Sequence, residues 1–210
     1  MTSRSGRCPN CGAPIDFKWS SSVQAVCEHC RSVVVRTDVD LKAVGTVADL
    51  PVDASPIQLL TEGRYGDKRF VVAGRIIYQY EQGNWNEWRI VLDGGGDGWL
   101  ADAQNELTVS FRVDIRNLPA PTEAPLGRSF AWNNTQFTVV SRTRAHYAGV
   151  EGELPFEYWD KTDVDFIDLR STHVDFATLD YSDSAPVLYV GRAVDIDELN
   201  LRNLRMFEGW

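Results

Sequence analysis

A chain of 210 residues with 43% hydrophobic and 24% charged residues can bury a sizeable core, which excludes a disordered protein. No apolar run approaches the length of about 18 residues that a membrane span needs, and no signal-peptide pattern follows Arg4. We therefore expect a cytoplasmic protein without a transmembrane segment. The net charge of −9 disfavours general attraction to nucleic acid or acidic lipid.

The charge is unevenly distributed along the chain. Residues 1–37 carry five basic and two acidic residues, which gives this head a net charge of +3. The remaining residues then carry −12. The sequence thus predicts a mildly basic head on an acidic body.

All four cysteines lie in the head, in two C-x-x-C pairs: Cys8, Cys11, Cys27 and Cys30. Each pair lets one tight turn direct two thiolates at the same ion, which is the arrangement of a tetrahedral zinc site. In a reducing cytosol such thiols rarely persist as disulfides. Short β-patterned stretches flank both pairs. We predict a zinc ribbon over residues 1–37 that holds a structural Zn²⁺.

The residues around the pairs refine this prediction. Gly12 follows Cys11 and suits a turn with unusual backbone angles. Arg31 stands in the corresponding place after Cys30, so we expect the second turn to be less ideal or differently shaped. His29 is an alternative ligand, but four thiols already suffice and we expect a solvated turn residue. Four cysteine ligands leave no open position for metal hydrolysis.

Two proline-containing breaks divide the rest of the chain. Residues 38–56 have weak periodicity and no aromatic residue, which predicts a flexible linker with one short turn. Residues 117–126 are rich in proline and predict a second linker. The sequence leaves a first β-module over 57–116 and a second over 127–210, the latter including a C-terminal segment.

Both modules are β-rich by pattern, and they resemble each other. Residues 69–83, RFVVAGRIIYQYEQG, align by eye with residues 136–150, QFTVVSRTRAHYAGV. We predict a mainly β protein with an internal duplication of an antiparallel β-module, arranged as two small barrels or as one joint sandwich. Asp195, three residues before Glu198, predicts a short C-terminal helix that ends near Phe207.

Three tryptophans mark the first module: Trp85, Trp88 and Trp99. Exposed tryptophans stack on bases or ligands, but between valine and isoleucine they are more often core residues. The run DGGGDG at 93–98 lacks the Lys-Ser/Thr ending of a phosphate loop and predicts a hairpin turn.

An acidic segment follows in the second module. Its carboxylates are Glu157, Asp160, Asp163, Asp165, Asp168, Asp175, Asp180 and Asp183. Paired carboxylates serve acid/base chemistry or bind cations, but no calcium-loop spacing occurs, and the alternation around Asp163 and Asp165 predicts a solvated strand face. His146 and His173 have no companion motif for a nucleophile. We therefore assign no catalytic and no organic-cofactor-binding residue.

The body resembles a known family. G-R-I-x-Y at 74–78, W-x-E-W at 85–88 and W-L at 99–100 are followed by F-A-T-x-D-Y-S at 176–182 and Y-x-G at 189–191. These motifs, over roughly residues 57–205, are similar to the bacterial domain-of-unknown-function family 4178 (DUF4178), many members of which carry such a ribbon. The resemblance implies a link to membrane-stress proteins and to polyamine-synthase-like enzymes, and it implies no catalytic residue.

From these observations we expect a non-enzymatic zinc-ribbon adaptor that binds protein partners, with membrane association only through a partner. The first alternative is nucleic-acid binding through the basic ribbon. The second is a polyamine-binding protein or an enzyme that uses the acidic body. A deep polar pocket between the modules would favour a ligand binder or an enzyme over an adaptor.

Overall fold

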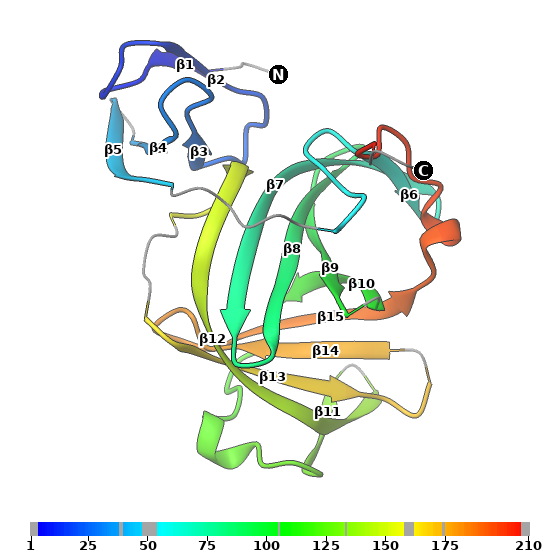
Figure 1. The fold of residues 1–210 in the computed structure, drawn as a ribbon. Helices are drawn as coiled ribbons and strands as arrows, with labels where there is room; N and C mark the ends of the chain where they lie inside the picture. Colours follow the sequence, from blue (N-terminus) through cyan, green and yellow to red (C-terminus); the bar gives the residue numbers. More distant parts are fainter. Residues whose placement is uncertain are drawn as a thin grey trace.

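The structure, a computed structural model, describes residues 4–37, 40–47, 54–104, 106–132, 134–157, 162–173 and 175–206. Its regular secondary structure is almost entirely antiparallel β-strand (Figure 1). The elements are β1 (Arg4–Arg7), β2 (Pro14–Phe17), β3 (Gln24–Val26), β4 (Ser32–Arg36), β5 (Leu41–Thr46), β6 (Glu62–Tyr65), β7 (Lys68–Tyr80), β8 (Gly83–Leu92), β9 (Asp97–Ala103), β10 (Glu106–Val113), η1 (Pro121–Glu123), β11 (Ser129–Trp132), β12 (Thr135–Leu154), β13 (Val164–Arg170), β14 (Asp175–Asp180), β15 (Val187–Val194) and η2 (Ile196–Leu199).

Within the described residues, eight strands close into one barrel. Their order is β7-β8-β9-β10-β15-β14-β13-β12, and β12 pairs with β7 to complete the circuit. Every pairing in the circuit is antiparallel. Figure 1 shows β7 and β8 running across β13, β14 and β15, as strands on opposite walls of a closed, twisted sheet do. The prediction of a mainly β fold is confirmed.

The barrel corrects the predicted arrangement of the two modules. Strands β7–β10 form one meander and β12–β15 another, and the two meanders join first strand to first strand and last strand to last strand. They therefore share one closed sheet, and they form neither two separate barrels nor a two-layer sandwich. Residues 69–83 and 136–150, aligned in the sequence, belong to the first strand of each meander. The duplication itself stays a prediction.

Glycines allow the two meanders to approach each other at both seams. A Cβ atom on Gly74 of β7 would overlap the Glu153 carbonyl of β12. At the other seam, a Cβ on Gly191 of β15 would overlap the Val109 carbonyl of β10. A larger residue at either position would force the strands apart, so the closure depends on glycine there.

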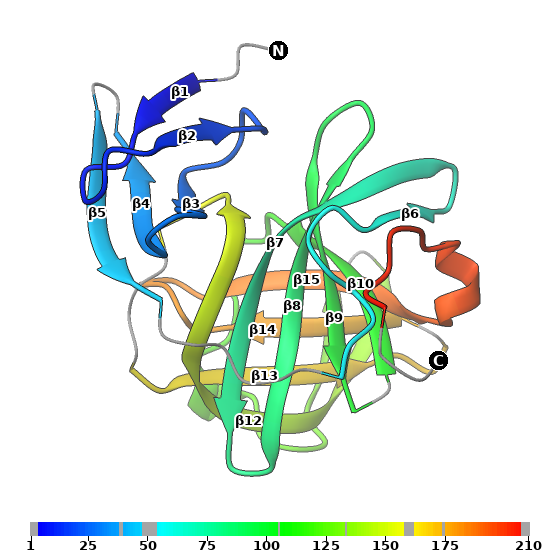
Figure 2. The same cartoon turned by 45° about the horizontal axis from the view of Figure 1, so that its top comes forward.

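The N-terminal head is docked on the barrel rather than tethered to it. Strands β1 and β2 pair with each other, and β3, β4 and β5 form a small sheet. The end of β12 leaves the barrel and pairs with β3, with Glu153 opposite Ala25 (Figure 2). One long strand therefore belongs to both sheets.

This docking corrects the predicted flexible linker over 38–56. Its residues 41–46 form β5, because Leu41 to Thr46 pair with β4. Residues 38–39 and 48–53 lie outside the described residues.

The barrel has apolar clusters on its outer surface, each covered by a connecting segment. Trp88, Ile90 and Leu100 pack beneath Ile57 and Leu199. On the second meander, Ile167, Leu169 and Leu179 pack beneath Ala124 and the half-buried Phe130. Because alternate side chains of a strand point to opposite faces, this outward burial leaves the other residues of these strands to line the interior.

The C-terminal prediction is corrected in extent. After Asp195 the chain forms only the short 3-10 turn η2, which ends at Leu199, and Phe207 lies outside the described residues. Among the described residues, no helix has the length and apolar character to cross a membrane.

Candidate functional site

Two turns of the same shape carry the four cysteines. In the first, the Gly12 N–H donates to the Cys8 carbonyl at 2.8 Å, and in the second the Arg31 N–H donates to the Cys27 carbonyl at 2.9 Å. Gly12 and Arg31 both have left-handed backbones, with φ of 76° and 59°. Of the two alternatives expected for the second turn, a different shape is therefore wrong. The turn is less ideal, because a non-glycine residue with a left-handed backbone is strained.

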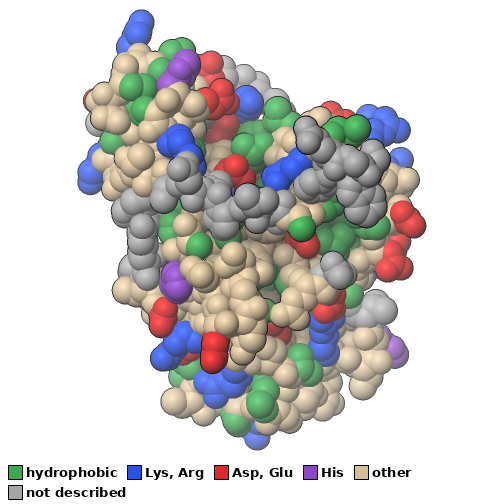
Figure 3. Space-filling model, viewed as in Figure 1, with side chains coloured by type: hydrophobic (Ala, Val, Ile, Leu, Met, Phe, Trp, Pro, Cys, Tyr) green, Lys and Arg blue, Asp and Glu red, His purple; other side chains and the backbone are tan. Residues whose placement is uncertain are grey.

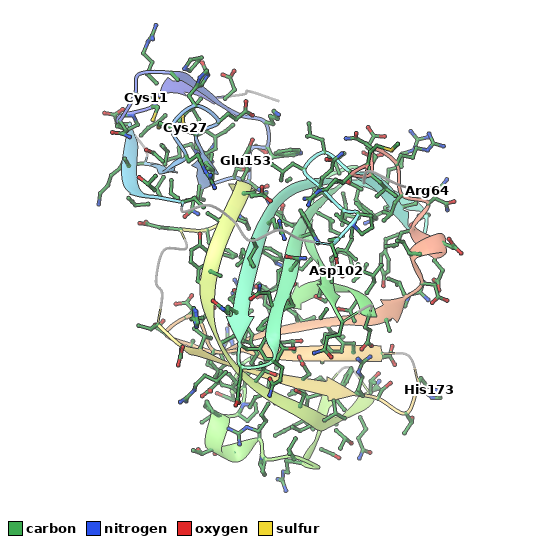
Figure 4. The ribbon with its side chains drawn as sticks, viewed as in Figure 1. Cys11, Cys27, Arg64, Asp102, Glu153 and His173 are labelled. Atoms are coloured by element: carbon green, nitrogen blue, oxygen red, sulfur yellow. The ribbon has the colours of Figure 1, made fainter. Side chains whose placement is uncertain are left out.

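The turns bring the four thiols together. The Sγ atoms of Cys8 and Cys30 lie 3.6 Å apart, those of Cys11 and Cys27 lie 3.8 Å apart, and all four lie within 4.8 Å of one another. A tetrahedral site with metal–sulfur bonds of about 2.3 Å has sulfurs about 3.8 Å apart. The cluster thus has the dimensions of a tetrahedral metal site (Figure 4 labels Cys11 and Cys27).

Polar neighbours support this cluster. The Ser32 Oγ lies 3.2 Å from the Cys30 Sγ and accepts a hydrogen bond from Asn10 Nδ2 at 2.9 Å. Through its hydroxyl and its backbone N–H, Ser32 lowers the pKa of the Cys30 thiol to about 6. A thiolate is the form that binds a metal ion. His29, weighed in the sequence as an alternative ligand, is exposed and is not part of the cluster.

A buried arginine joins the head to the barrel. Arg89 of β8 is fully buried and donates from Nη1 and Nη2 to the hydroxyls of Ser22 and Ser21 at 2.7 and 2.8 Å. Its Nη2 also lies 2.7 Å from Asp97 of β9. Glu153, labelled in Figure 4 at the head end of β12, accepts from the Lys18 N–H at 2.8 Å. The loop before β3 is therefore held by charge-assisted bonds from the barrel wall.

The interior of the barrel contains a second candidate site. An outer vestibule of about 580 Å³ continues into a narrow inner cavity of about 50 Å³. Six residues line both parts: Glu87, Ala101, Thr108, Phe166, Phe176 and Thr178. The inner end is closed by Trp99 and Phe156, which belong to or pack against the same apolar cluster as Val33 and Val47 of the head. The head therefore closes one end of the barrel.

Three carboxyl groups that form no ion pair with a described residue face this cavity from three strands, and a fourth, Glu106 of β10, lines the vestibule and is paired with Arg170. Asp180 lines the inner part, Asp168 lines the vestibule, and Glu87 lines both. Burial raises the pKa of Glu87 to about 8 and that of Asp168 to about 6, and it also raises the pKa of Asp180. The charges of Asp168 and Asp180 further raise the pKa of Glu87. These carboxyls are therefore held in a site that disfavours their charged form.

Neutral donors hold two of the carboxyls. Trp85 Nε1 donates to Glu87 at 3.1 Å, and Thr178 Oγ1 donates to Asp168 at 2.9 Å. In the described part of the chain, no lysine or arginine forms an ion pair with Glu87, Asp168 or Asp180.

Aromatic rings form the wall beside Glu87. The Tyr78 ring stacks on Trp85 with centroids 4.9 Å apart, and Phe166 meets Tyr78 edge-on, also at 4.9 Å. Thr108 is 5% exposed, lines both parts of the cavity, and its hydroxyl has no hydrogen-bond partner among the described residues. A buried hydroxyl without a partner is costly, and here it faces the cavity.

Side chains from both meanders meet at the mouth. Gln104 Nε2 donates to the Tyr80 hydroxyl at 2.5 Å, and Arg170 of β13 pairs with Glu106 of β10. Arg170 also lies over the Phe176 ring, 4.8 Å from its centroid. The mouth therefore carries paired charges, unlike the interior.

The structure places the residues that the sequence singled out in the core, at the cavity and in a turn. Trp88 and Trp99 are buried core residues as expected, and Trp99 also lines the inner cavity, whereas the half-buried Trp85 lines the vestibule. The run 93–98 contains the hairpin turn between β8 and β9, as predicted. The acidic segment is not simply a solvated face, because Asp168 and Asp180 point inward.

The two histidines to which the sequence assigned no role lie outside the cavity. His146 lies on the surface, 3.5 Å from Asp163, and His173 points away from the barrel in Figure 4. Glu87 was not identified from the sequence. A signal was present, because Trp85, Glu87 and Arg89 alternate along β8 and therefore share one strand face, whereas Trp88 and Ile90 lie on the other face.

Comparison with known proteins places the body of the chain in a family. The model of the domain of unknown function DUF4178 matches residues 59–196, which contain all the barrel strands. No curated protein and no solved structure matches the chain. Because the family model covers more than half of the sequence, the chain belongs to the DUF4178 family.

Proposed function

We propose that this protein is a non-enzymatic small-molecule receptor whose barrel binds the ligand and whose N-terminal head is a zinc ribbon that closes the barrel. The observation that carries the proposal is an internal cavity in which carboxyl and hydroxyl groups lie beside aromatic rings. Apolar clusters are buried on the outside of both meanders, and a third apolar cluster, which includes Ile76 and Trp99, lies at the inner end of the cavity. A vestibule of about 580 Å³ lies within the range of small-molecule sites.

Zn²⁺ is the metal that the cysteine cluster fits best. Four thiolates at tetrahedral separations suit zinc, and the protein fills every coordination position, so the ion would stabilise the head rather than take part in a reaction. Zinc bound here would favour the folded head, because the ion would hold together two separate turns of the head, one with Cys8 and Cys11 and one with Cys27 and Cys30.

The cavity makes a receptor the leading function in place of the adaptor. The adaptor role, its protein partners and a membrane-stress system stay predictions. Nucleic-acid binding through the head also stays a prediction. On the face in Figure 3, basic side chains are intermixed with acidic ones, which gives a phosphate backbone no continuous basic surface there.

The receptor proposal is tested with N-phenyl-1-naphthylamine, a neutral dye that fluoresces in apolar cavities. We expect saturable binding at one site per chain. Ala101→Trp, which fills the space shared by the vestibule and the inner cavity, should abolish it. Ala131→Trp, on the exposed edge strand β11, is the matched control and should bind normally. Equal binding by both variants would refute the proposal.

A further inference from the structure

We propose that the ligand of the barrel is a linear aliphatic amine that carries two or more ammonium groups. This inference rests on the proposed receptor function and adds the chemical class of the ligand. Four observations on the cavity support it.

The first observation is the arrangement of the carboxyls along the cavity. Asp180 lies in the inner part, Glu87 where the two parts meet, and Asp168 in the vestibule. The inner part has no lysine or arginine in its described lining. Two described arginines line the cavity, Arg142 and Arg170, and both lie in the vestibule, where Arg170 is paired with Glu106. An extended ligand entering from the mouth would meet these carboxyls one after another.

The second observation distinguishes an organic cation from a metal ion. Among the described residues, the cysteine cluster is the one group in which three or more candidate ligand atoms converge on a point. Glu87, Asp168 and Asp180 do not converge in this way. Their separation suits a ligand whose charges are distributed along a chain, since a small hard cation needs several oxygens around one centre.

The third observation is the wall between the carboxyls. The stacked rings of Tyr78 and Trp85, together with Phe166, offer aromatic faces beside Glu87. Such faces attract ammonium groups and also pack against methylene groups. The inner cavity of about 50 Å³ has too small a volume for a ring system but can hold the end of an alkyl chain.

The fourth observation is the unpartnered hydroxyl of Thr108, which is buried and faces both parts of the cavity. A hydroxyl oxygen accepts a hydrogen bond from an ammonium N–H. The ligand would therefore satisfy a polar atom that the described protein leaves without a partner.

Binding should depend on pH, because an ammonium group favours ionised carboxyls. The titratable groups that act on Glu87 are Asp168 on β13 and Asp180 on β14, and Tyr189 on β15 interacts with it electrostatically. Arg170 faces Asp168 and lowers its pKa, and Glu106 raises it. Since Glu87 has a pKa of about 8, amine binding should release protons and strengthen between pH 6 and pH 8.

The experiment is calorimetric titration of the full chain with 1,8-diaminooctane and with 1,8-octanediol, its uncharged counterpart, at pH 6 and pH 8. We expect the diamine to bind tighter than the diol, by roughly tenfold or more at pH 8. Glu87→Gln should remove most of this preference, and its amide oxygen still accepts from Trp85 Nε1. Glu62→Gln removes the same charge from the exposed strand β6 and should leave binding unchanged.

The outcomes separate this inference from the receptor proposal. If the dye or the diol binds and the diamine does not, the cavity takes neutral ligands and only the amine inference fails. If neither dye, diol nor diamine binds, both fail. An equal loss of diamine affinity in Glu87→Gln and Glu62→Gln would show attraction to the overall negative charge and would overturn the inference. Retained dye binding by Glu87→Gln shows that this variant is folded.

Discussion

The cysteine head and the barrel cavity are assembled in different ways. All four thiols come from residues 8 to 30, where two turns of the same shape bring them together. The cavity carboxyls come from β8, β13 and β14, which lie far apart in sequence. The head is thus recognisable from local spacing, whereas the cavity exists only because the sheet closes. Even so, the two are in contact, since the head covers the inner end of the barrel.

The largest effect should come from breaking the metal cluster. Cys27→Ser removes a buried ligand, and we expect loss of bound zinc and unfolding of the head, because structural zinc contributes about 10 kcal/mol or more to such folds. The barrel should also melt at a lower temperature, since Val33 and Val47 share its core cluster. Metal analysis and calorimetry measure both effects.

The control for this variant is His29→Ala, in the same turn. It should keep one zinc per chain and the wild-type melting temperature, since His29 is exposed and outside the cluster. If Cys27→Ser left the melting temperature of the barrel unchanged, the head and the barrel would unfold independently, which contradicts the contact between them.

The next largest effect should come from Arg89, which joins the head to the barrel. Arg89→Ala removes a fully buried guanidinium and leaves Asp97 without its partner, so we expect a loss of about 3–5 kcal/mol in the free energy of unfolding. Arg112→Ala removes an arginine from an exposed pair with Asp114 and should cost less than about 1 kcal/mol. Urea unfolding compares the two. Similar losses would mean that Arg89 does not join the head to the barrel.

A smaller effect concerns the cavity itself. The folded pKa of Glu87, about 8, lies above its unfolded value of 4.5, so the folded state binds more protons between these values. The Glu87 carboxyl therefore lowers the free energy of unfolding as the pH rises from about 4.5 to about 8. Above pH 8 its effect no longer changes with pH. Glu87→Gln should flatten this part of the pH profile and raise the melting temperature at pH 8.

Thermal unfolding from pH 5 to pH 9 measures this profile. Glu62→Gln should keep the wild-type slope, because Glu62 is exposed on β6. If Glu87→Gln and Glu62→Gln both kept the wild-type slope, the raised pKa of Glu87 would be contradicted.

The smallest effect sharpens the comparison of the two cysteine turns. Arg31→Gly removes the strain of a non-glycine residue with a left-handed backbone and should stabilise the head by about 1 kcal/mol. The loss of a further interaction that Arg31 makes would reduce this gain. Gly12→Ala should destabilise the other turn by a similar amount. Resistance of the zinc-loaded protein to a chelator measures both. Destabilisation by Arg31→Gly would show that the side chain outweighs the backbone strain.

The strands were largely predictable because their signals are local. Alternating β-branched and aromatic residues marked β7, β8 and β10, and the glycine run marked the turn before β9. Strand β5 was missed, because residues 41–46 have little apolar periodicity and gain their place from pairing with β4. How the strands pair was not predictable, since β10 meets β15 and β7 meets β12 across long stretches of chain.

The sequence by itself determined the cysteine cluster, the β class and the family motifs, because each depends on residues that are close along the chain or on composition. Only the tertiary structure decided that Glu87, Asp168 and Asp180 face one cavity. An alternating strand has two faces, and its pattern does not say which face is inside. In this barrel one strand face is covered from outside by the segments around Ile57 and Ala124, which leaves the other face, with its carboxyls and aromatic rings, to line the interior.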